Sequence, residues 1–156
     1  MSADTTGLAK TALIETLEKM RDDVRNLAGP LSEAEFWTKP IDPGNSVGHL
    51  VLHLSGNLNH FVGAQLGGSG YVRDREREFT ETRVPSKAEA LEKLDEAVAI
   101  FRRVVSGLSA EQLAVPHPEA RFGLVMNALM SLLAHFALHR GQISYIARLV
   151  QKPQMP

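Results

Sequence analysis

The chain of 156 residues has no cysteine, few aromatic residues and no long hydrophobic run. The absence of cysteine excludes disulfides, thiolate metal ligands and a cysteine nucleophile, and it is compatible with a reducing cytoplasm. No apolar run approaches the roughly 20 residues that span a bilayer, and the first residues lack the basic-then-apolar order of a signal peptide. We therefore expect a cytoplasmic protein that is not bound to a membrane.

The chain also lacks an excess of either charge. It has 17 Lys and Arg residues against 18 Asp and Glu residues, for a net charge of -1. This balance provides no broad electrostatic attraction for a polyanion, so we expect no nucleic-acid partner. The length is most simply that of one domain over residues 1–156, which is long enough to bury a substantial core.

The chain is rich in Leu and Ala and has no β-branched run that alternates with polar residues. This composition favours helices. Four long segments have apolar residues at the three- and four-residue spacing of an amphipathic helix. They cover residues 5–27, 46–67 after a cap at Asn45 or Ser46, 87–106, and a last segment from residue 122 or 125 to residue 150. The pattern predicts an all-α four-helix bundle.

Short extra helices are expected between the long ones. Ser32 and Ser86 each begin a Ser-x-x-Glu capping box, the first for a short helix and the second for the third long helix, and Ser109 could begin one more short turn. Residues 71–79 mix both charge signs and are interpreted as a long, solvated crossover loop. The alternative is that Arg73 or Arg75 borders a pocket and binds an anionic substrate.

The histidines carry the strongest functional signal. His135 and His139 are four residues apart in the last helix, so they lie about 40° apart around its axis and can face the same point. This is metal-ligand spacing, although an isolated histidine on a helix is more often solvated or hydrogen-bonded. Residue 136 is Phe rather than Glu, which disfavours a zincin metalloprotease. His117, between two prolines, is expected to be exposed.

A third ligand would have to come from the second long helix, where His49, His53 and His60 share one face. His53 and His60 are about 10 Å apart along the axis, so both could not join His135 and His139 at one ion in a regular helix. We therefore expect one ligand from this helix. Three imidazoles plus solvent would provide the open coordination of a catalytic metal.

Two motifs together resemble the DinB/YfiT-like superfamily of small metal-binding four-helix bundles, over nearly the whole chain. They are Ser46-x-Gly48-x-Leu50-x-x-His53 and His135-x-x-x-His139-x-Gly141-Gln142. The resemblance implies that His53, His135 and His139 bind a divalent metal ion, with zinc or nickel the leading candidates.

Three further residues are candidates to support this site. His49 departs from the family pattern, because relatives often carry Trp or another bulky residue there; it could support the site, act as an alternative ligand, or simply pack, and we expect packing. Asn57 and Gln142 could each hydrogen-bond to a ligand, or could be ordinary polar residues on a helix surface.

The resemblance also implies candidate functions. Relatives include mycothiol-dependent maleylpyruvate isomerase and bacillithiol S-transferases, which implies a small-molecule substrate and a low-molecular-weight thiol held by the metal. Metal-assisted hydrolysis is a second possibility, weakened because no Asp or Glu is adjacent to either histidine stretch. A third is a non-catalytic metal-binding or stress-response bundle. Relatives often form homodimers, so a homodimer is expected.

Overall fold

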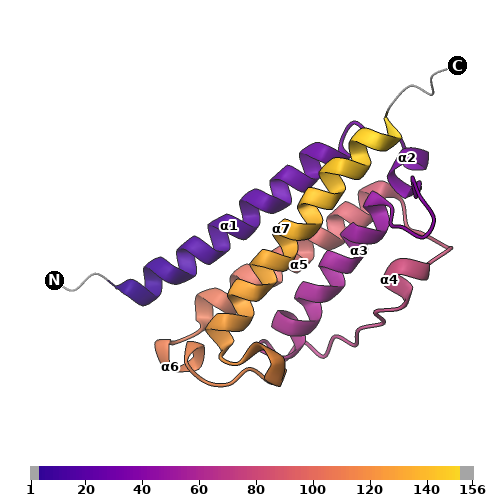
Figure 1. Ribbon diagram of the computed structural model, residues 1–156. Coiled ribbons are helices and arrows are strands. Elements are labelled where there is room, and N and C mark those ends of the chain that lie inside the picture. The colour runs from indigo at the N-terminus through magenta and orange to yellow at the C-terminus, as the bar shows by residue number, and fades with distance from the viewer. Residues whose placement is uncertain (1–3, 152–156) are drawn as a thin grey trace, which may run out of the picture.

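Four long helices form the body of the protein in a computed structural model that describes residues 4–151 (Figure 1). They are α1 (Thr5–Ala28), α3 (Val47–Leu58), α5 (Lys87–Gly107) and α7 (Val125–Val150). Four short helices lie between them: α2 (Glu33–Trp37), α4 (Arg77–Thr80), α6 (Ala110–Leu113) and the 3-10 helix η2 (Ala120–Phe122). No strand is present within the described residues, so the predicted all-α four-helix bundle is confirmed.

The helix starts are set by side chains that cap the free backbone N–H groups. The hydroxyl oxygens of Ser32, Ser86 and Ser109 accept hydrogen bonds from the backbone N–H three residues later, and each forms a complete capping box. Ser46 caps α3 in the same way, through the N–H of His49. The predicted starts of α1, α3 and α5 are correct to within one residue, and α7 begins at the later of its two predicted positions, Val125, without a side-chain cap.

The second predicted helix differs from the structure at its end. Instead of continuing as a regular α-helix to residue 67, α3 passes into a π-helical segment, η1 (Asn59–Ala64). A π-turn widens the helix and changes the direction of the following side chains, a change that apolar spacing alone does not predict.

The four long helices are not arranged in chain order. α1 packs mainly on α5 and α7, and α3 also packs on α5 and α7, so α1 and α3 are diagonal to one another. Figure 1 shows that α3 and α5 run in the same direction, opposite to α1 and α7. The chain must therefore return along the bundle between α3 and α5, and this return places α4 against α3.

The core lies between the facing sides of these helices. Its largest fully buried side chains come from α1, α2, α3, α5 and α7 and the α1–α2 turn, and include Leu17, Leu31, Phe36, Leu54, Leu94, Phe101, Leu129 and Phe136. The contact between α3 and α7 has a functional consequence, because these are the two helices that carry the conspicuous histidines. No helix within residues 4–151 combines the length and apolar character needed to cross a lipid bilayer.

Candidate metal centre

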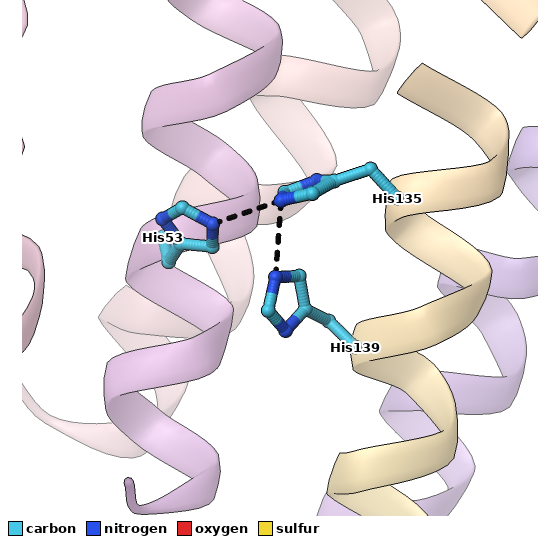
Figure 2. Close-up of side chains that lie close together, drawn as sticks. All are labelled: His53, His135 and His139. Atoms are coloured by element: carbon cyan, nitrogen blue, oxygen red, sulfur yellow. Dashed lines mark hydrogen bonds between the residues drawn. The ribbon is translucent and has the colours of Figure 1, made fainter. Parts of the chain in front are cut away.

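Three histidines from two neighbouring helices point toward one another (Figure 2). His53 comes from α3, and His135 and His139 come from successive turns of α7. The Nε2 atom of His135 lies 3.1 Å from Nε2 of His53 and 3.0 Å from Nε2 of His139. One candidate ligand atom from each residue falls within 4.8 Å of the others, so the structure brings together the three residues predicted as ligands.

In two of these rings, the hydrogen bond made by Nδ1 determines whether Nε2 carries a proton or a lone pair. Nδ1 of His53 lies 2.8 Å from Oε2 of Glu78, and Nδ1 of His139 lies 2.6 Å from Oε1 of Gln142. Both oxygens accept, so both Nδ1 atoms carry the proton and both Nε2 atoms present a lone pair. These two lone pairs face the Nε2 of the same third ring, His135.

His135 cannot satisfy both neighbours. A neutral imidazole has one N–H, so its Nε2 can donate to only one of the two facing lone pairs. Burial, together with the positive charges around it, lowers the pKa of His135 to about 4, so the ring stays neutral at pH 7. Its Nδ1 is buried and has no hydrogen-bond partner within the described chain. With its proton on Nδ1 instead, His135 would present a third Nε2 lone pair, and the donor set would then fit a cation that accepts all three.

Glu78 is held in place at the back of His53 by an arginine. Its carboxylate is 7% exposed, and it accepts hydrogen bonds from Nε of Arg73 at 2.7 Å and from Nη2 of Arg73 at 2.8 Å. Burial alone would raise the pKa of Glu78, but the hydrogen bonds from His53 and Arg73 outweigh burial and hold that pKa below its usual range. A carboxylate in this place fixes the orientation and tautomer of the imidazole.

A glycine on α3 makes room for this carboxylate. A Cβ atom at Gly56 would collide with Oε1 of Glu78, while the glycine leaves the space open. Gly56, one turn after His53, therefore leaves space on α3 for the Glu78 side chain of α4.

The charged segment 71–79 is mostly an exposed crossover, as predicted, but two of its side chains are not solvated. It contains the start of α4, and it buries Glu78 together with the Arg73 side chain, which is only 8% exposed. Their opposite charges and paired hydrogen bonds compensate for burial, which neither charge would tolerate alone. Sequence analysis missed Glu78 because it lies 25 residues from His53, in a run where several acidic residues look alike.

His49 lies one turn before His53 but in a different environment. Its Nδ1 lies 2.6 Å from Oγ of Ser46, its Nε2 lies 3.3 Å from the carbonyl oxygen of Glu81, and its ring meets the edge of Trp37. Burial lowers the pKa of His49. Both ring nitrogens have partners outside the three-histidine group, which is the geometry of a packing residue.

His117 is buried, so the prediction that it would be exposed was wrong. Its ring is 3% exposed, its Nε2 lies 3.2 Å from the carbonyl oxygen of Phe61, and its Nδ1 accepts from the backbone N–H of Glu119 at 3.0 Å. The flanking prolines do bring irregular backbone, but backbone hydrogen bonds to Gly123 and beyond fold this loop back onto η1. The ring thereby links the loop to the helix.

The three histidines open into a cavity of about 880 Å³. Asn57, His60, Gln142 and three arginines contribute polar groups to its wall, and Phe61, Phe79, Phe122 and Leu132 contribute apolar ones. This volume lies within the range of small-molecule sites. Most of the residues in the wall are polar, with a few large apolar side chains among them.

Helical bundles build metal and ligand sites from side chains on facing helices, and the three histidines on α3 and α7 are a candidate site of this kind. The chain is a member of the DinB superfamily, whose sequence pattern matches residues 16–143. No curated protein gives a sequence match.

Two solved structures share the fold. One is a conserved protein from Enterococcus faecalis, with a TM-score of 0.73 at 19% identity over 90% of this chain and 95% of that one. The other is YfiT from Bacillus subtilis, described as a probable metal-dependent hydrolase with an unusual four-helix bundle topology; its TM-score is 0.71 at 19% identity, over 95% of this chain and 89% of that one.

Proposed function

We propose that His53, His135 and His139 bind a divalent metal ion and that the protein is a metal-dependent enzyme acting on a small molecule. The observation that carries this proposal is the convergence of three Nε2 atoms at the wall of a cavity, two of them with their lone pairs facing inward. Zinc and nickel are the leading candidates, because neutral imidazole suits both ions.

The ligand count supports a catalytic rather than a purely structural ion. Within residues 4–151, the group of side chains able to hold one ion consists of three histidines. Structural zinc sites usually have four protein ligands, whereas catalytic sites keep a position open for solvent or substrate. When bound, such an ion supplies Lewis acidity that lowers the pKa of a bound water or thiol.

The first candidate reaction is thiol-dependent transfer or isomerisation, with a low-molecular-weight thiol supplied from outside because the chain has no cysteine. This candidate rests on the resemblance to thiol-dependent members of the superfamily, and the family match itself specifies no reaction. In this reaction the residues of the cavity would orient the thiol and the electrophile, while Glu78 and Gln142 would hold His53 and His139 in their ligating orientation.

The second candidate reaction is hydrolysis. The description of the Bacillus subtilis relative favours it. The structure also removes part of the objection that no carboxylate is near the histidines, because Glu119 lines the cavity. Glu78 is not available as a base, since its two oxygens are occupied by Arg73 and His53.

Cobalt substitution tests the proposal and separates the two reactions. We expect one cobalt per chain, with visible absorption that shifts when cysteine or glutathione is added and the thiol reaches the ion. A thiol-induced shift with turnover of an electrophile such as chlorodinitrobenzene supports transfer; turnover of esters or amides without thiol supports hydrolysis. If neither substrate reacts and metal removal only lowers thermal stability, the protein is a non-catalytic bundle and the enzyme proposal is wrong.

The expected homodimer remains part of this proposal. Leu138 and Tyr145 are large side chains two turns apart on α7 that lie exposed to solvent, and they would suit a partner helix. Light scattering after size exclusion is expected to give twice the mass of 17.1 kDa, and Tyr145→Lys is expected to give the monomer mass.

A further inference from the structure

Positive charge collects at the cavity without matching negative charge. Arg73, Arg75 and Arg121 line it, whereas Glu119 is the acidic residue among its wall residues. Arg73 is closely paired with Glu78, whereas Arg75 forms no ion pair within residues 4–151 and Arg121 has only a long contact of 3.8 Å with Glu119. Arg75 and Arg121 therefore keep donors for a ligand. These two come from chain segments that are far apart in sequence and reach the same cavity.

We propose that Arg75 and Arg121 bind the oxyanion group, a carboxylate or a phosphate, of a small organic anion whose apolar body lies along the phenylalanines of the cavity. This inference rests on the proposed function, since it assigns the class of substrate to the same cavity. It adds a recognition site that consists of arginines rather than metal ligands.

Arg121 is held by aromatic rings rather than by a strong ion pair. Its guanidinium lies 4.8 Å from the ring centre of Phe122 and 5.1 Å from that of Phe61. Its nearest acidic contact, Nε to Oε2 of Glu119, is long at 3.8 Å. Stacking positions the guanidinium plane but uses none of its N–H groups, so the donors stay available for a ligand.

Arg75 has the same kind of support. Its guanidinium lies 5.5 Å from the ring centre of Phe79, and it forms no ion pair within residues 4–151. The neighbouring Arg73 shows the contrast, because its Nε and Nη2 both donate to Glu78. Arginine forms paired hydrogen bonds with planar oxyanions, which makes a free, stacked arginine at a cavity wall a suitable anion receptor.

The field of these arginines extends to the histidines. Arg73 and Arg121 line the same cavity as the three histidines. A bound divalent ion would add further positive charge at the same wall. The three arginines of the wall outweigh the one glutamate, Glu119, so the net charge of the wall attracts an anionic molecule and repels a cationic one.

The test measures binding of benzoate and of phenyl phosphate by calorimetry, with benzamide as the uncharged counterpart. Each titration uses the full chain, once loaded with zinc and once treated with a chelator. We expect at least one of the two anions to bind in both states, and benzamide to bind about tenfold more weakly, as loss of a charge-assisted hydrogen bond implies. Preference for one anion identifies the oxyanion as carboxylate or phosphate.

Arg75→Gln and Arg121→Gln are each expected to weaken anion binding about tenfold with unchanged zinc content. Arg102→Gln is the matched control, because Arg102 is as exposed as Arg121, 64% for each side chain, and also pairs with a glutamate, but lies on α5 away from the cavity. Wild-type affinity in both cavity variants, an equal loss in the control, or equal binding of benzamide would overturn the inference.

The two proposals fail separately in this design. Zinc stoichiometry reports on the histidines alone, and anion binding to chelator-treated protein reports on the arginines alone. A chain that binds zinc but shows no arginine-dependent anion binding would contradict only the anion site. A chain that binds no zinc would contradict the proposed function, whatever its affinity for benzoate.

Discussion

His49 and His53 lie one turn apart on α3, and both are buried, yet the structure gives them opposite surroundings. Both ring nitrogens of His49 have partners in Ser46 and Glu81. In His53, only Nδ1 has such a partner, and Nε2 points with its lone pair at another histidine. Burial therefore does not separate a candidate metal ligand from a packing residue, whereas the convergence of acceptor nitrogens does.

The largest expected effect comes from removing the converging nitrogens themselves. His135→Ala and His139→Ala are each expected to abolish tight zinc binding, and His53→Ala nearly so, because two imidazoles hold an ion poorly. His49→Ala is expected to keep one zinc per chain. Metal analysis after gel filtration measures the difference, and zinc retained by His53→Ala but lost by His49→Ala would reverse the comparison.

The next largest effect on zinc affinity is expected from Glu78, which orients the His53 ring. Glu78→Gln is expected to weaken zinc affinity roughly 10–100-fold, because the imidazole loses the carboxylate that orients it and raises its basicity. Gly56→Ala should have a similar effect, since its Cβ would displace the same carboxylate. Competition with a chromophoric chelator measures both affinities.

Glu76→Gln is the control for this second prediction, because Glu76 is an exposed residue beside α4. Its zinc affinity should match the wild type. Wild-type affinity in Glu78→Gln would show that the contact with His53 serves folding and not metal binding.

His117 is, after His49, a second buried histidine outside the three-histidine group. Its replacement is expected to lower stability and to leave metal binding unchanged. His117→Ala leaves the buried Phe61 carbonyl and the half-buried Glu119 N–H without their partner, and an unsatisfied buried group such as the carbonyl costs roughly 1–3 kcal/mol. Urea denaturation should show the lower free energy of unfolding while zinc stoichiometry stays at one. Loss of zinc at unchanged stability would place His117 in the metal site.

The smallest effect is the pH dependence that His49 contributes. Burial holds the pKa of folded His49 below the value of 6.5, so the unfolded chain binds more protons at this residue as the pH falls below 6.5. Stability is therefore lost on acidification, and His49→Asn should lose less of it than the wild type between pH 7 and pH 5. Parallel denaturation curves for the two proteins across that range would contradict this account of His49.

Much of the fold follows from local signals. The capping serine Ser86 predicts where α5 begins, and apolar spacing predicts the extent of α1 and α7, because caps and periodicity are properties of neighbouring residues. The diagonal placement of α1 and α3 does not follow, since amphipathic faces are compatible with several helix orders.

The candidate site divides in the same way. The spacing of His135 and His139 is a local feature, and the sequence motifs point to His53 as their companion. Glu78 and His117 could not be placed in advance, because their partners lie 25 and 56 residues away and depend on how the crossover and the last loop fold back. Charge pattern and flanking prolines describe the chain around them, but not the contact that buries them.

Anomalous diffraction from crystals of the zinc-loaded protein, recorded at the zinc absorption edge, tests the central claim most directly. We predict one strong peak per chain, about 2.0–2.1 Å from Nε2 of His53, His135 and His139, with solvent or substrate completing the coordination. A peak at His49, His60 or His117, or a fourth protein ligand at the three histidines, would contradict the assignment of an open, catalytic metal site.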